Sequence, residues 1–459
     1  MRGPGAEPAS AARAPAAGSA EQHFAKAMTL LQAQRLEDAL LAFDRALLLS
    51  PRSVAVLFNR GGVLSDLGRH DEALAAFDRA IAVEPRFVDA HVSRALALAK
   101  LGRAKLALTS IDVALRLDSG SFDAQEARAD LLRDQGRSAE ALVLYERLSA
   151  LQPGSVGVLN SQGIALQNLG RLIEALAVYD AALRIEPDFP PALTNRGVTL
   201  TRLGRYEEAL ACYEKALRVD PDFASAHLNK GTCRLILGDF ALGWKEYEWR
   251  WRSAWWKGTQ GFYGRRTFDR PLWLGKQSLA GKTIFLHPEQ GLGDTVQFSR
   301  YARLLADRGA QVVLEVQPQL RALLGGLAGV SQLSAVGEAV PAHDFHCPLM
   351  SLPLACDTRL DSIPAASGYL QPELLQPRKV DFWRDKLGTH GRRRIGLVWS
   401  GNATHRNDAN RSIPFAKIAS LVSDRHDFYC LQNEIRQADR QAAPGPSGNR
   451  WPRPGSSPG

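Results

Sequence analysis

The sequence predicts an α solenoid followed by a smaller α/β region, and three observations lead to this fold class. A unit of 34 residues recurs seven times from Ala20 onward. Five tryptophans crowd the end of the seventh copy, at residues 244–256. Beyond Gly281, short apolar runs alternate with helical patterns, which is typical of a parallel sheet covered by helices. At 459 residues, the chain has room for about three domains.

The composition argues against two classes of protein. The 57 Lys and Arg against 48 Asp and Glu give a net charge of +9, but the positive residues are spread along the chain, which disfavours nucleic-acid binding. No apolar run approaches the ~20 residues that a membrane span needs. The five cysteines form no C-x-x-C pair, and residues 1–19 resemble a disordered leader more than a secretory signal. We therefore expect a cytoplasmic protein with reduced thiols.

Each repeat unit, within residues 20–257, has the residues that a helical hairpin needs. Glycine usually stands at position 15, where the chain turns between the helices, and proline usually stands at position 32, where the second helix ends. The small residues at position 8 are Ala27, Gly61, Ala95, Ala129, Gly163, Gly197 and Gly231. The aromatic residues at position 24 are Phe43, Phe77, Tyr145, Tyr179, Tyr213 and Tyr247. A bulky side chain would fill the hole that a small one leaves between the two helices.

The repeated pattern resembles the tetratricopeptide repeat family. Stacked hairpins of this kind leave a concave groove, so the resemblance implies a protein or extended peptide as partner. Asn59, Asn195 and Asn229 stand at position 6. Tetratricopeptide arrays of protein glycosyltransferases line their concave face with such asparagines, whose amides both donate to and accept from a peptide backbone. The alternative is that each asparagine bonds only to local backbone or water. The other copies carry Ala25, Ser93, Ala127 and Ser161, so any asparagine ladder is interrupted.

The tryptophans after the seventh copy predict a junction. Trp244, Trp249, Trp251, Trp255 and Trp256 would cap the last repeat and pack it against the next domain. Residues 258–280 are rich in glycine and loop-forming residues and are expected to be a linker.

Residues 281–378 are expected to begin with a strand, Thr283–His287, followed by a helix over Thr295–Arg308. A second strand over Gln311–Val316 and a helix over Pro318–Leu327 follow. The first strand leads into the sequence PEQGLGDT, where Gly291 and Gly293 allow a tight turn. In such folds a ligand binds at the carboxyl end of the strands.

This string and the later IGLVWSGNATHRNDANRSIP together resemble bacterial tetratricopeptide-glycosyltransferase proteins. Their two-lobed catalytic part, called GT-B, is similar to heptosyltransferases and, more distantly, to protein O-GlcNAc transferases. The resemblance implies a Rossmann-like first lobe over 281–378 and a partial second lobe over 379–440. It also implies that Asp294 is a catalytic base. The alternative is a capping box in which Asp294 pairs with Gln297 at the start of a helix. His287 is a second base candidate, although a histidine that ends a buried strand is more often structural.

The second lobe would hold the phosphates of a nucleotide-sugar, which is a donor substrate, so no cofactor is expected. Ser400, Asn402 and Arg406 lie in the loop after the strand Ile395–Trp399, where backbone amides and guanidinium groups can bind pyrophosphate. The resemblance implies a further donor contact at Arg411. The alternative is that this is a solvated loop rich in arginine and asparagine. No acidic metal site is visible, and the spacing of His343, His346 and Cys347 fits no common zinc site.

The C-terminal residues 441–459 are rich in Pro, Gly and Ser and are expected to be a disordered tail. The family's donor-pocket segment is absent, which a premature stop, a shifted reading frame or divergence would explain. The first functional prediction is peptide binding by the solenoid coupled to a glycosyltransferase-like domain with little or no activity. The alternative is an interaction scaffold with a degenerate α/β remnant.

Overall fold

The computed structural model describes residues 18–253, 266–364, 368–370, 377–388, 392–401, 408–423, 425–432 and 434–440. The chain divides into two compact units, one of Met1–Leu320 with Ala328–Ser367 and one of Arg321–Leu327 with Gly368–Gly459. The first unit contains the helical array and a parallel sheet. No described helix combines the length and the apolar character that crossing a membrane requires.

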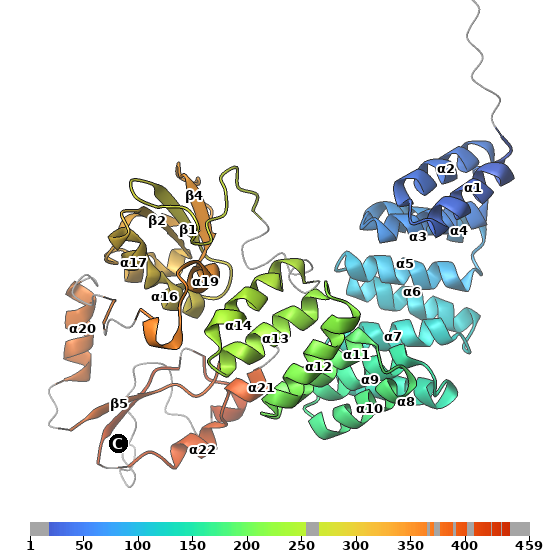
Figure 1. Ribbon diagram of the computed structural model, residues 1–459. Coiled ribbons are helices and arrows are strands. Elements are labelled where there is room, and N and C mark those ends of the chain that lie inside the picture. Colours follow the sequence, from blue (N-terminus) through green and yellow to red (C-terminus); the bar gives the residue numbers. More distant parts are fainter. Residues whose placement is uncertain are drawn as a thin grey trace, which may run out of the picture. The chain divides into compact units, whose positions relative to one another are not determined.

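The array consists of seven antiparallel helix pairs stacked in sequence order (Figure 1). The first helices are α1 (Ala20–Gln32), α3 (Val54–Asp66), α5 (Val88–Lys100), α7 (Phe122–Asp134), α9 (Val156–Asn168), α11 (Pro190–Arg202) and α13 (Ala224–Ile236). The second helices are α2 (Leu36–Leu49), α4 (His70–Val83), α6 (Ala104–Leu117), α8 (Ser138–Leu151), α10 (Leu172–Ile185), α12 (Tyr206–Val219) and α14 (Phe240–Tyr247). The predicted solenoid is confirmed.

The turn inside each hairpin depends on a left-handed residue at position 15. Gly68 has φ of 74°, and its backbone N–H donates to Ser65 O while Arg69 N–H donates to Leu64 O. These two bonds close the helix end and reverse the chain. The first repeat makes the same turn with Gln34 at φ 57°, a conformation that costs a side-chain-bearing residue free energy.

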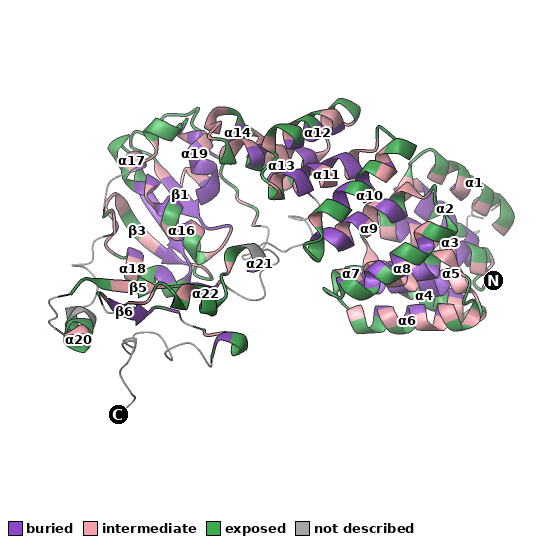
Figure 2. Ribbon diagram, turned by 90° about the horizontal axis from the view of Figure 1, so that it is seen from below, coloured by how far each residue is buried: buried purple, intermediate pink, exposed green. Residues whose placement is uncertain are grey.

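The two helices of a hairpin cross closely where position 8 meets position 24. A Cβ added to Gly61 would lie 2.5 Å from the ring of Phe77, whereas one added to the adjacent Gly62 would meet nothing within 4 Å. Phe77 is itself buried, as are the aromatic residues at this position in most other repeats. Small and large residues therefore interlock along the centre of the array, where the buried surface is concentrated (Figure 2).

The array ends in a 3-10 helix, η1 (Glu248–Arg252), that carries part of the tryptophan cluster. The ring of Trp244 contacts Phe298 of the α/β region edge to face, with ring centroids 6.1 Å apart. Trp249 instead stacks on His227 of the last repeat at 3.8 Å. The expected capping and packing roles are thus divided between different tryptophans; Trp255 and Trp256 lie outside the described residues.

The sheet of the first unit has four parallel strands in the order β3-β2-β1-β4. Its strands are β1 (Thr283–His287), β2 (Gln311–Val316), β3 (Val330–Ala335) and β4 (Phe345–Pro348). The helices between and after these strands are α16 (Leu292–Ser299), α17 (Tyr301–Asp307), η2 (Pro318–Leu320), α18 (Arg321–Leu324), η3 (Leu349–Ser351), α19 (Leu352–Ala355) and η4 (Leu360–Ser362). Of these, α18 belongs to the second compact unit. The first two strands have the predicted bounds. The two-lobed glycosyltransferase fold stays a prediction.

The single helix predicted over Thr295–Arg308 is wrong, because the helix breaks at Arg300. The Ser299 hydroxyl donates to Val296 O and Arg300 Nε donates to Gln297 O, so both side chains compete for carbonyls of the preceding turn. The helix predicted over Pro318–Leu327 is likewise shorter and divided between η2 and α18.

The second unit contains two parallel strands, β5 (Arg394–Leu397) and β6 (Asp427–Cys430), within its described residues. Its helices are α20 (Pro377–Leu387), α21 (Asp408–Arg411), α22 (Phe415–Ala419) and η6 (Gln437–Asp439). The strand predicted over Ile395–Trp399 ends earlier, at Leu397. The backbone N–H groups of Trp399 and Ser400 donate to the side chain of Gln432, each at 3.2 Å, instead of continuing the ladder.

Candidate functional site

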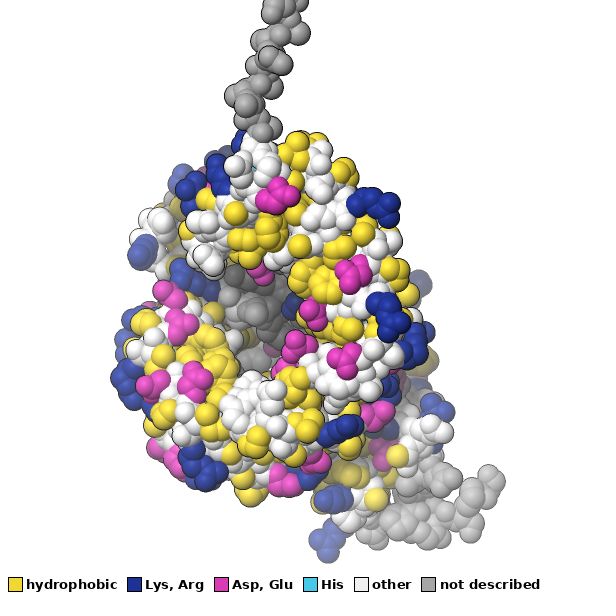
Figure 3. Space-filling view, turned by 90° about the vertical axis from the view of Figure 1, so that its right-hand side faces the viewer, with side chains coloured by type: hydrophobic (Ala, Val, Ile, Leu, Met, Phe, Trp, Pro, Cys, Tyr) yellow, Lys and Arg dark blue, Asp and Glu magenta, His cyan; other side chains and the backbone are white. Residues whose placement is uncertain are grey.

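The array forms a cavity of about 430 Å³ on the inner face of its second, third and fourth repeats. All its lining residues stand at positions 2, 5, 6 or 9 of α3, α5 and α7, which are the positions that the first helices turn toward the concave side. The lining residues are Phe58, Asp89, Val92, Ser93, Leu96, Asp123, Glu126, Ala127 and Asp130. Figure 3 shows that this face of the molecule is hollowed, with apolar and acidic side chains around the hollow.

The cavity opens where the asparagine ladder is interrupted. Position 6 is Ser93 in the third repeat and Ala127 in the fourth, and both side chains are too short to fill the groove. The apolar wall is fixed by packing, because the Phe58 ring lies 5.0 Å from that of Phe87 and 5.9 Å from that of Phe77. The cavity is therefore a preformed recess with one apolar side.

The acidic side of the cavity combines paired and unpaired carboxylates. Asp130 accepts a hydrogen bond of 2.5 Å from the Tyr145 hydroxyl and pairs with Arg133 at 2.7 Å. Glu126 lies one turn earlier on α7 and is half-buried. Burial, together with the nearby charges of Asp130 and Asp123, raises the pKa of Glu126. This carboxylate is held where its negative charge is poorly compensated.

The three predicted peptide-binding asparagines lie outside the cavity lining. The Asn59 side chain donates to Ala55 O and that of Asn229 to Ser225 O, both at 2.8 Å within their own helices. Asn195 donates to the side chain of Asn160 in the preceding repeat at 2.9 Å. Asn59 and Asn229 therefore make the local backbone bonds of the alternative interpretation. A peptide-binding role for the three asparagines stays a prediction.

The predicted catalytic aspartate lies at the carboxyl end of β1, in the first turn of α16. The backbone N–H of Gly291 donates to Asp294 Oδ2 at 3.1 Å, which makes Gly291 the helix N-cap and Asp294 its third residue. Asp294 therefore has a helix-capping contact, as the alternative predicted, but it is the third residue of the capping box and not its N-cap. Gly293 leaves open space beside the loop. A role for Asp294 as catalytic base stays a prediction.

His287 ends β1 as predicted and is buried among aromatic rings. Its ring stacks on Phe268 at 4.7 Å, and its Nε2 lies 3.3 Å from Nδ1 of His346 on β4. Burial and the neighbouring His346 lower the pKa of His287 to about 3. This setting favours the structural alternative for His287.

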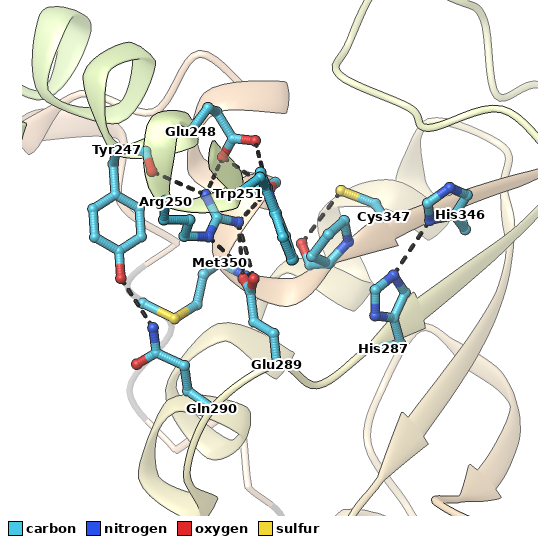
Figure 4. A network of polar contacts seen from close by, with 12 residues as sticks. Tyr247, Glu248, Arg250, Trp251, His287, Glu289, Gln290, His346, Cys347 and Met350 are labelled. Carbon is cyan, nitrogen blue, oxygen red and sulfur yellow. Dashed lines mark hydrogen bonds and ion pairs between the residues drawn. The ribbon is translucent and has the colours of Figure 1, made fainter. Parts of the chain in front are cut away.

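A buried polar network joins the end of the array to the loop after β1 (Figure 4). The Arg250 guanidinium of η1 is fully buried and bonds both carboxylate oxygens of Glu289, at 3.0 and 3.1 Å. It also donates to Glu248 at 2.5 Å and to Ser351 Oγ at 2.7 Å. Glu289 accepts in addition from the backbone N–H of Met350. The array and the sheet are held together by an almost completely paired set of charges.

The sequence analysis missed Arg250 and Glu289, although both occupy stretches that it discussed. Burial raises the pKa of Glu289 to about 7, against the opposing pull of Arg250 and of the Met350 N–H. Glu289 stands inside the PEQGLGDT string, two residues before Gly291 and two residues after the end of the buried strand. A charged residue so close to a buried strand end is the signal that could have found it.

The predicted donor-binding residues of the second unit are only partly described. Ser400 is buried and Arg411 is exposed. A Cβ added to Gly401, the residue after Ser400, would lie 3.7 Å from Nη2 of Arg411. Ser400 and Arg411, two of the predicted donor-binding residues, therefore lie close together. Arg436 forms an ion pair with Asp408 and donates to Ser412 Oγ at 2.8 Å, adding a second guanidinium to this corner. Asn402 and Arg406 lie outside the described residues.

No described group of three His, Cys, Asp or Glu side chains is arranged to hold a metal ion. His346 and Cys347 lie on β4, where the Cys347 side chain is fully buried. His343 precedes the strand, and its Nδ1 lies 2.8 Å from Pro341 O.

Comparison with protein families identifies the array. Residues 24–82, 63–122 and 126–190 match one tetratricopeptide repeat model, and residues 190–223 match another. The predicted repeat type is thereby confirmed, and the family matches lie within the array. No curated protein matches this chain.

Several solved structures resemble part of the chain. A tetratricopeptide repeat protein from Parabacteroides merdae is 18% identical, with 50% of this chain and 91% of that chain covered and a TM-score of 0.44. A thermophilic tetratricopeptide repeat protein from Thermus thermophilus is 24% identical, with 40% and 100% covered and a TM-score of 0.37. YrrB, described as having an unusual peptide-binding site, is 25% identical, with 40% and 95% covered and a TM-score of 0.31.

Proposed function

We propose that this chain, whose array consists of tetratricopeptide repeats, binds an extended segment of another protein in the groove formed by α3, α5 and α7. The observation that carries the proposal is the 430 Å³ cavity, which has the size of a site for a few side chains. Its wall is made by regularly spaced positions of three consecutive repeats, so a segment running along the groove would contact the corresponding positions of each repeat in turn.

Preorganisation supports this function. Phe58 is held by two aromatic neighbours, and Val92 is buried in its helix, so little side-chain freedom remains to be lost on binding. The side chain of Leu96 is 46% exposed and leaves apolar surface for a partner to cover.

The proposal can be tested with a library of random twelve-residue peptides passed over the immobilised full chain. We expect the native chain to retain a set of peptides and the variant Ser93→Phe to lose them, because the new ring fills the cavity. Thr109→Phe is the matched control, since Thr109 is exposed on α6 and does not line the cavity. Equal retention by Ser93→Phe and the native chain would contradict binding in this groove.

A second candidate function is transfer of a sugar from a nucleotide-sugar to an acceptor hydroxyl. It is favoured by the parallel order β3-β2-β1-β4 together with the glycine loop at the carboxyl end of β1. The chemistry would need a base such as Asp294 to accept the proton of the acceptor. Arg411 and the backbone after Ser400 would contact the donor phosphates.

Calorimetric titration with a panel of uridine, guanosine and adenosine diphosphate sugars tests this candidate. We expect no binding heat from this chain alone. Heat that disappears in Arg411→Ala but persists in Arg384→Ala would instead support the transferase function, since Arg384 pairs with Asp381 on α20 and was not assigned to the donor site.

A further inference from the structure

Three of the four carboxylates that line the cavity have no basic partner among the described residues, whereas the fourth, Asp130, pairs with Arg133. Asp44, Asp78 and Asp180 each pair with an arginine sixteen residues later, at 2.6–2.7 Å. In the described part of the chain, by contrast, no basic side chain forms an ion pair with Asp89, Asp123 or Glu126. The cavity thus collects negative charge in a protein whose net charge is +9.

Helix ends explain only part of this charge. Asp89 and Asp123 stand in the first turns of α5 and α7, where the positive end of a helix stabilises a carboxylate. Glu126 stands one turn further along α7, where that effect has faded. It is nevertheless half-buried between Asp123 and Asp130.

The same three repeats also supply the apolar side of the cavity. Position 5 is Phe58, Val92 and Glu126 in successive repeats, so the surface changes from apolar to acidic along the groove. A partner that covers Phe58 and Leu96 would therefore bring its next side chains against the carboxylates. An acidic or neutral neighbour would leave Glu126 buried further without compensation.

We propose that the segment bound in this cavity is basic: a lysine or arginine lies among Asp89, Asp123 and Glu126, and a neighbouring apolar side chain packs against Phe58 and Leu96. This inference rests on the proposed peptide-binding function and specifies the partner by charge complementarity. The raised pKa of Glu126 agrees with this inference. It shows that the negative charge of Glu126 is unfavourable in the cavity, and a bound cation would neutralise that charge as a proton does.

The test is the composition of the peptides that the full chain retains from the random library. We expect enrichment of lysine or arginine beside leucine, phenylalanine or another large apolar residue. Retained peptides without basic enrichment would overturn this inference while leaving the peptide-binding function in place. Retention of no peptide would overturn both.

Affinity measurements on one retained peptide sharpen the test. The variant Asp89→Asn/Asp123→Asn/Glu126→Gln removes the charges but keeps the side-chain shapes, and we expect it to weaken binding at least tenfold. Glu146→Gln is the control, because Glu146 is exposed on α8 outside the cavity lining. On the native chain, raising the salt from 0.15 to 0.5 M should also weaken binding. Unchanged affinity in either experiment would overturn the inference.

Discussion

Arg250 and Glu289 form a bidentate ion pair between the helix that ends the repeat array and the loop that follows β1, with less than a twentieth of either side chain exposed. A guanidinium and a carboxylate buried in this way both lose their hydration, so each depends on the other. Glu248 and Ser351 bind the remaining donors of Arg250. The ion pair thus makes the folding of the last repeat and of the sheet interdependent.

Removing one partner of this pair should be strongly destabilising. We expect Arg250→Met to lower the free energy of unfolding by about 3–5 kcal/mol, because Glu289 is left buried without its counter-charge. The double variant Arg250→Met/Glu289→Met should lose less than the sum of the single losses. Chemical denaturation, with amide exchange of β1 and α13 as local readouts, measures both. Arg303→Met, which breaks an exposed pair with Asp307, should change stability by less than about 0.5 kcal/mol.

Independent responses of β1 and α13 to Arg250→Met would contradict the interdependence. If protection were lost in the sheet while the last repeat kept its exchange rates, the pair would serve only the α/β region.

The sheet should lose stability in acid through its buried histidines. Burial lowers the pKa of His287 to about 3 and that of His346 to about 4, below the usual value of ~6.5 that an unfolded chain would show. The unfolded state therefore binds more protons as the pH falls from about 6.5, and the stabilisation present above that pH is lost toward pH 4. His287→Phe keeps the ring stacking on Phe268 but removes the titrating group. Between pH 6.5 and 4, we expect the free energy of unfolding of this variant to fall less than that of the native chain, by up to about 3 kcal/mol. Amide exchange of β1 and β4 across this pH range gives the measurement.

Glu289 acts with the opposite sign over an overlapping pH window, from its usual carboxyl value of 4.5 to about 7. Its pKa of about 7 lies above the usual carboxyl value, so its contribution is present at low pH and declines as the pH rises toward 7. A native chain whose sheet is no more acid-sensitive than the His287→Phe variant would show that His287 does not carry the predicted effect.

The close crossing of helices in the second repeat distinguishes two adjacent glycines. Gly61→Ala places a methyl group against the buried ring of Phe77, whereas Gly62→Ala meets open space and gains helix propensity. We expect the Gly61 variant to be less stable than the Gly62 variant by about 1–3 kcal/mol. Urea denaturation followed by circular dichroism compares the two. Equal midpoints would mean that the Phe77 ring moves aside without cost, as it would if the crossing were not tightly packed.

The sequence could predict what is repeated and could not predict what occurs once. Small residues at position 8 and glycine at position 15 recur in nearly every copy, so the helix bounds of the array follow from periodicity. The Arg250–Glu289 pair joins residues 39 positions apart through a single tertiary contact, which leaves no periodic trace. The break at Arg300 also depends on local side-chain hydrogen bonds that compete with the helix.

The sequence analysis predicted that the array has a groove, but not which repeats form the cavity in it. Attention to the asparagines at position 6 led to Asn59, Asn195 and Asn229, whereas the cavity opens where that position is Ser93 or Ala127. A recess forms where side chains are short, so polar residues that recur at a single position of the repeat do not indicate where it lies. Reading positions 2 and 5 together would have brought Asp123 and Glu126 into view.

The first repeat carries a removable strain at its hairpin turn. Gln34 takes the left-handed conformation that glycine takes in the other six repeats, and its N–H and that of Arg35 make the same turn-closing bonds, to Leu31 O and Leu30 O. We expect Gln34→Gly to raise the free energy of unfolding by about 1 kcal/mol and the reciprocal Gly68→Gln to lower it by a similar amount. Urea denaturation measures the pair, and slower amide exchange in α1 would locate the gain. Ala25→Gly, in the exposed interior of α1, should instead lower stability by about 1 kcal/mol. Because the two glycine substitutions lie in the same repeat, opposite signs would separate relief of backbone strain from any general effect of glycine, and equal signs would refute the strain at Gln34.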